Sequence, residues 1–252
     1  MSDETFLHAY FLNNSGKPIH KWLHYFDIYE KHFGRFRGRK PTILEIGVYK
    51  GGSLEMWRAY FGEGARIIGL DINPECKKHE GENIEVFIGS QDDPALLDAI
   101  VKKYGDIDIV INDGSHISSH MIATFSHLYD RISPTGVHFV EDTHACYWPK
   151  WGGGLKAPGS FMEFVKDRVD ELHDFYIDRT RPRSRFASST AGICVYDSIV
   201  AFERRPQGKR QDVVTGRRRS GTRPYHDAAE GLSGGGYRVR RERATPPCWR
   251  RG

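Results

Sequence analysis

The feature that most constrains this chain is a series of short apolar runs, each followed by a segment with helical spacing. Apolar residues are nearly continuous within each run, which is typical of parallel strands covered on both faces. Alternation of such strands with helices predicts βαβ units and a doubly wound sheet. The predicted strands are TILEIGV (42–48), RIIGLDI (66–72), IEVFIGS (84–90), DIVIND (108–113) and GVHFVED (136–142).

The segments between and around these runs complete the predicted fold. FYIDRT (175–180) and ICVYDSIVAFER (193–204) predict two further strands, with a turn signal at Asp197-Ser198. We therefore expect an α/β, Rossmann-like fold: a doubly wound, mostly parallel seven-stranded sheet with helices on both faces. Helical spacing predicts helices over residues 17–33, 52–62, 93–105, 117–132 and 161–175.

The charge is distributed unevenly along the chain. Residues 204–252 contain 14 Lys/Arg and 4 Asp/Glu, out of 37 and 33 in all 252 residues, so the first 203 residues are mildly acidic. The tail is rich in Gly, Ser and Pro, which predicts disorder, and it has no nucleic-acid motif with interleaved aromatic residues. We expect a helical cover (1–40), one α/β domain (41–203) and a basic tail (204–252), with no nucleic acid as partner.

The remaining bulk features place the protein in the cytoplasm by default. No run approaches the ~18 to 20 apolar residues that a membrane span requires, and the N-terminus lacks the pattern of a secretory signal. Cys76, Cys146, Cys194 and Cys248 are widely spaced and form no CxxC pair. This favours reduced thiols over a disulfide framework or a zinc ribbon.

The loop LEIGVYKGGS (44–53) follows the first predicted strand. Its glycines do not fit the dinucleotide fingerprint GxGxxG, and Ser53 stands where a phosphate-binding P-loop requires Lys. The second strand ends in Asp71, where a carboxylate suits the hydroxyls of a ribose. Glu45 before the glycines favours a cationic ligand such as S-adenosylmethionine, and Gln91 and Asp92 are then available to the adenine. Alternatively, Glu45 caps the sheet and Asp71 is an ordinary loop carboxylate.

Carboxylates end the fourth and fifth predicted strands. Adjacent strands lie ~4.8 Å apart, so Asp113 is expected to face Glu141 and Asp142. Three carboxylates this close repel one another unless cations or protons neutralise them. Oxygen ligands of this kind favour Mg²⁺, or a similar hard cation such as Mn²⁺. Successive strand residues point to opposite faces, so Glu141 and Asp142 can share a metal only if the strand breaks there.

Histidines and aromatic residues accompany these carboxylates. His116 is expected near Asp113 at the start of the next helix, where a neutral imidazole can take a proton from a hydroxyl. His120, one turn further on, is expected to pack or to support the site. His144 is a candidate substrate contact or a hydrogen-bonded loop histidine. The aromatic residues of CYWPKWGGG, Tyr147, Trp148 and Trp151, either stack on a ring or sugar face or pack beneath their loop.

LEIGVYKGGSLEMW, LDIN, INDGSH and VEDTHACYW together resemble the metal-dependent macrolide-sugar O-methyltransferases, which are class I S-adenosylmethionine-dependent methyltransferases. Relatives of this kind are often labelled cephalosporin hydroxylases. The resemblance covers roughly residues 17–200 and implies methyl transfer to a hydroxyl of a sugar or glycosylated natural product. It implies Asp113, Glu141 and Asp142 as Mg²⁺ ligands and His116 as general base. The resemblance implies Glu45, Gly47, Asp71 and Gln91 as cofactor-binding residues. Tyr49, Ser53 and Asp92 are further expected cofactor residues, and the expected substrate contacts are His144, Tyr147 and Trp148.

Two other functions remain open from the sequence. His116, His120 and a carboxylate match the ligand types of a non-haem iron oxygenase, although the glycine loop and Asp71 would then have no nucleoside to bind. The second alternative function is that of a non-catalytic nucleoside-binding module that brings the basic tail to a membrane. The members of the family that this chain resembles carry an extra N-terminal domain that helps to assemble the oligomer, so a homo-oligomer and the acceptor pocket are left undecided.

Overall fold

The computed structural model describes residues 5–177, 182–208, 211, 213, 215 and 216. The chain divides into residues 1–208 and residues 209–252. The predicted basic tail from residue 204 therefore falls largely outside the described residues. Among the described residues, no helix is both long enough and apolar enough to cross a lipid bilayer.

One seven-stranded sheet forms the centre of the first unit, in the order β3-β2-β1-β4-β5-β7-β6. The first five strands are parallel, whereas β7 is antiparallel to both β5 and β6. The order of the strands reverses at β1, and such a switch point opens a crevice at the carboxyl ends of the strands. The strands are β1 (Thr42–Ile46), β2 (Arg66–Asp71), β3 (Ile84–Ile88), β4 (Ile107–Asn112), β5 (Ile132–Val140), β6 (Thr190–Tyr196) and β7 (Ile199–Arg204).

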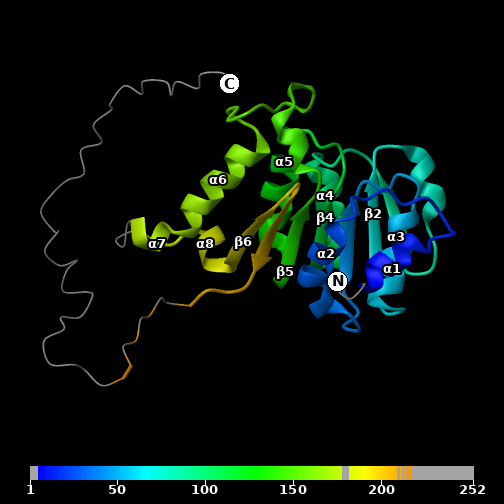
Figure 1. Cartoon of the computed structure of the whole chain (residues 1–252), viewed down its shortest axis with the longest axis horizontal. Helices are drawn as coiled ribbons and strands as arrows, with labels where there is room; N and C mark the ends of the chain where they lie inside the picture. The colour runs from blue at the N-terminus through cyan, green and yellow to red at the C-terminus, as the bar shows by residue number, and fades with distance from the viewer. Residues whose placement is uncertain (1–4, 178–181, 209–210, 212, 214, 217–252) are drawn as a thin grey trace, which may run out of the picture. The chain divides into compact units, whose positions relative to one another are not determined.

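Helices lie on both sides of this sheet (Figure 1). The α-helices are α1 (Phe6–Leu12), α2 (Tyr25–Phe33), α3 (Gly52–Phe61), α4 (Pro94–Tyr104), α5 (Ser118–Leu128), α6 (Phe161–Leu172), α7 (Asp174–Ile177) and α8 (Arg185–Ser189). Short 3₁₀ turns complete the described structure: η1 (Gly34–Phe36), η2 (Pro74–His79), η3 (Tyr129–Arg131), η4 (Thr143–Tyr147) and η5 (Pro149–Trp151).

Two hydrophobic clusters cover the two faces of the sheet. Ile43 of β1 packs in one cluster with Trp57 of α3 and Tyr29 of α2. Leu44, the next residue of β1, packs in the other cluster with Phe125 of α5. All five residues of β1 are buried, because helices cover both faces of the sheet. The N-terminal helices thus share a core with the sheet.

The predicted fold class is confirmed, with corrections to individual elements. The strand predicted over 175–180 is wrong where the chain is described, because 174–177 form α7; so short an apolar run does not distinguish a helix from a strand. The seventh strand arises instead because residues 193–204 form a hairpin that turns at Asp197 and Ser198. The helix predicted over 17–33 begins only at Tyr25.

Candidate active site at the carboxyl end of the sheet

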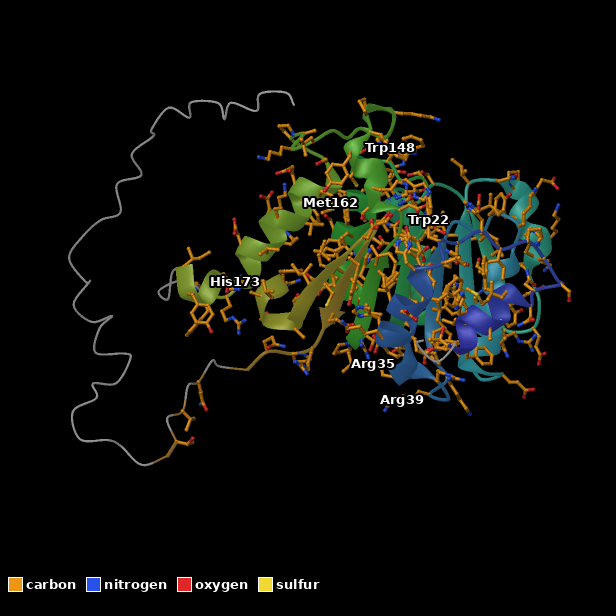
Figure 2. All side chains as sticks on the ribbon, in the orientation of Figure 1. Trp22, Arg35, Arg39, Trp148, Met162 and His173 are labelled. Carbon is orange, nitrogen blue, oxygen red and sulfur yellow. The ribbon has the colours of Figure 1, made fainter. Side chains whose placement is uncertain are left out.

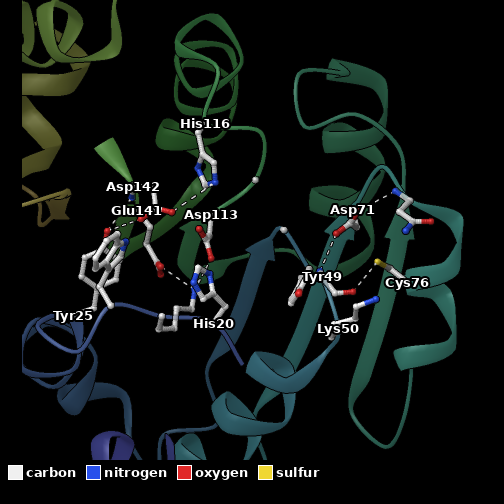
Figure 3. Close-up of a pocket in the computed structure, with 15 residues that line it drawn as sticks. His20, Tyr25, Tyr49, Lys50, Asp71, Cys76, Asp113, His116, Glu141 and Asp142 are labelled. Carbon is white, nitrogen blue, oxygen red and sulfur yellow. Dashed lines mark hydrogen bonds and ion pairs between the residues drawn. The ribbon is translucent and has the colours of Figure 1, made fainter. Parts of the chain in front are cut away.

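The carboxyl ends of β1, β2, β4 and β5 surround a cavity of about 440 Å³. A second cavity of about 300 Å³ adjoins it, and Gly47, Asp71 and Gly114 line both. The first cavity contains the acidic residues Asp113, Glu141 and Asp142 together with His116 (Figure 3). The second is the more apolar of the two and includes Leu70, Ile72 and Ile117 in its wall.

Asp113, His116 and Asp142 come together in the first cavity. One potential ligand atom from each lies within 4.8 Å of the others. Asp113 directly follows β4, and β5 ends at Val140. Asp142 has a φ of 52°, a left-handed conformation that breaks the strand as a shared site requires. His116 also has a left-handed backbone (φ 56°) and precedes α5 rather than opening it.

Lys21 lies between two of these carboxylates and was missed in the sequence analysis. Its Nζ donates hydrogen bonds to Asp113 Oδ2 (2.6 Å) and Glu141 Oε2 (2.8 Å). Glu45 Oε1 lies 4.0 Å from the same nitrogen, and the lysine side chain is only 3% exposed. A cluster of carboxylates needs positive charge, but Lys21 is 92 residues from Asp113 in the sequence, and nothing local relates the two.

Burial changes the proton affinity of the inner carboxylates. Burial raises the pKa of Glu141 to about 8 and that of Glu45 to about 7, and in both cases the charge of Lys21 opposes the shift. Burial also disfavours the charge of Lys21, yet Asp113, Glu141 and Glu45 together hold its pKa well above the ordinary value. The ammonium group is therefore charged at neutral pH.

The donor set fits a hard divalent cation. Asp113 and Asp142 each offer carboxylate oxygen, the ligand type that Mg²⁺ and Mn²⁺ prefer, and the His116 imidazole lies beside them. Glu141 Oε1 is buried and makes no hydrogen bond of normal geometry among the described residues, although the buried Tyr29 hydroxyl is near enough to lower the pKa of Glu141. Glu141 nevertheless lies outside the compact group of Asp113, His116 and Asp142.

A hydrogen-bond network of Tyr25, Ser198 and His144 orients the Asp142 carboxylate. The Tyr25 hydroxyl donates to Asp142 Oδ1 (2.6 Å), and its oxygen also lies 2.7 Å from Ser198 Oγ. Ser198 Oγ in turn bonds His144 Nδ1. The turn between β6 and β7 thus supports the loop that follows β5.

The glycine loop packs directly against the acidic residues. Asp71 Oδ2 accepts hydrogen bonds from the backbone nitrogens of Val48 (2.8 Å) and Tyr49 (3.1 Å). Gly47 has a φ of 97°, and a Cβ atom at this position would lie 2.0 Å from the Asp113 carbonyl oxygen. Only glycine therefore allows the end of β1 to approach the end of β4 this closely.

The predicted cofactor residues divide into two groups. Gly47, Tyr49, Asp71 and Gln91 line the cavities, although the Gln91 amide also bonds Asn112, Thr124 and the Ser115 backbone. Glu45, Ser53 and Asp92 do not line either cavity. Glu45 is completely buried and accepts hydrogen bonds from Ser53 Oγ (2.7 Å) and Trp57 Nε1 (2.9 Å).

His120 lines the second cavity. Its Nδ1 lies 3.1 Å from Ser115 Oγ, and its Nε2 lies 3.5 Å from Asp92 Oδ2. His120 is thus part of the wall of the second cavity, whereas the sequence predicted only packing or support of the site. It does not belong to the Asp113–His116–Asp142 group.

The predicted substrate residues lie outside the first cavity, but an aromatic series connects them to it. Trp22, which lines the cavity, makes an edge contact with His144 (ring centroids 6.0 Å apart). His144 contacts Trp148 at 4.9 Å, and Trp148 contacts Trp151 at 5.5 Å. Figure 2 shows Trp22 and Trp148 at the same end of the sheet, with Arg35 and Arg39 at the other. Trp22 (53% exposed) and Trp148 (48%) present unusually large aromatic surfaces to solvent.

Comparisons with known proteins identify relatives of this chain. No known protein-family profile matches the sequence. The chain is 40% identical over 193 residues to 8-demethyl-8-alpha-L-rhamnosyl tetracenomycin-C 2'-O-methyltransferase of Streptomyces olivaceus. The aligned residues cover 72% of this chain and 50% of that protein. It is 36% identical over 200 residues to demethylmacrocin O-methyltransferase of Streptomyces fradiae (73% and 50%).

This chain is a homologue of these sugar O-methyltransferases. This chain spans about half the length of the curated relatives that it matches. Among solved structures, it is similar to MycE methyltransferase from the mycinamycin biosynthetic pathway in complex with Mg, SAH and mycinamycin VI. That similarity has a TM-score of 0.73 at 27% identity and covers 90% of this chain and 58% of the other.

Proposed function

We propose that this homologue is a divalent-cation-dependent O-methyltransferase that transfers a methyl group from S-adenosylmethionine to a sugar hydroxyl. The observation that carries the proposal is the convergence of Asp113, His116 and Asp142 in a cavity that adjoins a second, more apolar one at the switch point of the sheet. The MycE complex with Mg, SAH and mycinamycin VI supports both the cation and the cofactor.

In this proposal the two cavities have different ligands. The second cavity and the glycine loop bind the nucleoside, with Asp71 holding the loop in shape and His120 and Gln91 forming the wall. Asp113, Asp142 and Glu141 hold Mg²⁺ or Mn²⁺ in the first cavity. A cation bound there supplies positive charge that lowers the pKa of an acceptor hydroxyl.

His116 is the proposed general base. In its neutral form it takes the proton of the acceptor hydroxyl, while an oxygen–methyl bond forms and the sulfur–methyl bond of S-adenosylmethionine breaks. Asp142 Oδ2 lies 3.7 Å from His116 Nε2, so a carboxylate stands ready to stabilise the imidazolium that results. The balance of charge is preserved, because the sulfonium loses one positive charge as His116 gains one.

Trp22, Trp148 and Trp151 are the proposed acceptor platform. Their rings run from the first cavity outward along the loop 143–151. Aromatic rings stack well on the apolar faces of sugars and flat aglycones. The natural acceptor is accordingly proposed to be a sugar attached to a larger apolar molecule.

The structure offers less support for an iron oxygenase. Such a site needs two histidines and one carboxylate around one ion. His120 points to Ser115 and Asp92 instead of joining His116 and Asp113. The carboxylate oxygens that remain suit Mg²⁺ or Mn²⁺.

Methyl transfer with and without a divalent cation tests the proposal. Purified protein is incubated with S-adenosylmethionine and a panel of demethylated glycosides, and S-adenosylhomocysteine is quantified by mass spectrometry. We expect turnover that EDTA abolishes and Mg²⁺ restores. Activity that persists in EDTA would contradict the cation, and binding of 2-oxoglutarate with Fe²⁺ in place of S-adenosylmethionine would favour the oxygenase.

A further inference from the structure

The three carboxylates of the proposed cation site share a pattern. Each has one oxygen held by the protein: Asp113 Oδ2 and Glu141 Oε2 by Lys21, and Asp142 Oδ1 by Tyr25. The second oxygen of Glu141 has no hydrogen-bond partner among the described residues, and that of Asp142 lies 3.7 Å from His116. The protein thus fixes one oxygen of each carboxylate by a hydrogen bond from Lys21 or Tyr25.

Exposure separates the site into an inner and an outer layer. The side chains of Lys21 (3% exposed) and Glu141 (1%) form the inner layer. Those of His116 and Asp142 (25% each) form the outer layer, and Asp113 (19%) connects the two. A ligand that enters the cavity therefore meets Asp142, His116 and Asp113 before it meets Lys21.

We propose that Lys21 is a positioning residue of the cation site, an internal counter-ion that remains in place when the divalent cation binds. The inference rests on the proposed function, because it concerns the same site. Asp113, Glu141 and Asp142 carry three negative charges when ionised; one divalent cation balances two of them, and Lys21, which also faces Glu45 at 4.0 Å, offsets the remaining negative charge. Without Lys21, two mostly buried carboxylates would repel each other and lose the geometry that the cation requires.

A competing role for Lys21 predicts the opposite result. Its ammonium group repels a divalent cation, so a lysine that merely occupies the empty site would weaken cation binding, and its removal would strengthen it. A positioning residue has the reverse effect, since loss of residues that orient metal ligands typically costs ~10–100-fold in metal affinity. The direction of the change in affinity distinguishes the two roles.

The test is Mn²⁺ binding, measured by calorimetry or electron paramagnetic resonance on the full chain. For Lys21→Met we expect Mn²⁺ affinity to fall ~10–100-fold, with S-adenosylhomocysteine affinity retained. Lys17→Met is the matched control, because Lys17 lies in the same segment and its ammonium group pairs with Glu55 at the surface (2.8 Å), away from the carboxylates of the site; its Mn²⁺ affinity should equal that of the parent. Unchanged or tighter Mn²⁺ binding by Lys21→Met would overturn the inference.

A second variant and the Mn²⁺ affinity of the parent protein complete the test. If circular dichroism shows that Lys21→Met does not fold, Lys21→Gln takes its place: its amide can still donate a hydrogen bond but carries no charge, and we again expect weaker Mn²⁺ binding. Unchanged or tighter binding there would also overturn the inference. If the parent itself binds no Mn²⁺, the cation of the proposed function fails; if the parent binds Mn²⁺ and the Lys21 variants bind it equally well, only the role of Lys21 fails.

Discussion

Tyr25 donates a 2.6 Å hydrogen bond to Asp142 across 117 residues of sequence. The tyrosine opens α2, whereas the aspartate follows β5 in a left-handed conformation. Packing of an N-terminal helix against the sheet therefore determines how a residue of the candidate site is oriented.

We predict that Tyr25→Phe weakens Mn²⁺ binding by ~10-fold, because Asp142 loses the hydroxyl that orients it. Methyl transfer should fall in parallel at low Mn²⁺ and recover partly when Mn²⁺ is raised. Calorimetry and initial rates check this. Tyr60→Phe is the control. It also removes a hydrogen bond from a tyrosine to a carboxylate, here Glu30 (2.8 Å), and both residues lie outside the two cavities.

His116→Ala should lower turnover by ~10²–10⁴-fold and leave S-adenosylhomocysteine affinity close to that of the parent, because a general base acts in the transition state. Steady-state rates and calorimetry separate the two quantities. His127→Ala, which removes a surface histidine paired with Asp98 (2.9 Å), should retain the parent rate. If His116→Ala lost cofactor affinity but kept turnover at saturating cofactor, His116 would be a binding residue.

Gly47→Ala should destabilise the protein more than Gly105→Ala does. Both glycines have positive φ (97° and 71°), so both substitutions add backbone strain of ~1–3 kcal/mol. Only at Gly47 does the new Cβ also collide with backbone, at the Asp113 carbonyl; nothing lies within 4 Å at Gly105. Urea unfolding of the two variants measures the difference, and equal losses would show that the collision is relieved at little cost.

The buried His138 should make stability depend on pH. Burial lowers its pKa to about 3, and neither ring nitrogen has a hydrogen-bond partner among the described residues. The unfolded chain takes up a proton below about pH 6.5 and the folded chain does not, so this contribution to stability is present above pH 6.5 and is lost as pH falls toward 3.

The loss attributable to His138 should approach ~1.4 kcal/mol per pH unit below pH 6. His138→Phe removes the titrating group from an aromatic environment that includes Phe125 (ring centroids 5.1 Å apart). Urea unfolding at pH 8 and pH 5 should show a smaller drop in stability for this variant than for the parent. An equal drop in both proteins would assign the acid sensitivity to other groups.

Local sequence patterns were sufficient for the fold class and for the ends of several strands. Continuous apolar runs placed Asp113 and Asp142 at the ends of the fourth and fifth predicted strands, and the ends of parallel strands meet at one edge of the sheet. The same patterns gave wrong predictions for 174–177 and for 17–24. The first range has only three consecutive apolar residues and the second mixes polar and apolar residues, so neither shows a clear helical or strand periodicity.

The tertiary structure decided which side chains meet. The candidate site gains four residues from segments distant in sequence: Lys21, Trp22, Tyr25 and Ser198. β5 ends at Val140, and the left-handed turn at Asp142 follows it, although the predicted strand extended to residue 142. Periodicity reports which face of an element is buried, but not which distant residue that face contacts. The sequence alone therefore determined where the carboxylates gather, and only the packed chain determined the lysine and tyrosine that hold them.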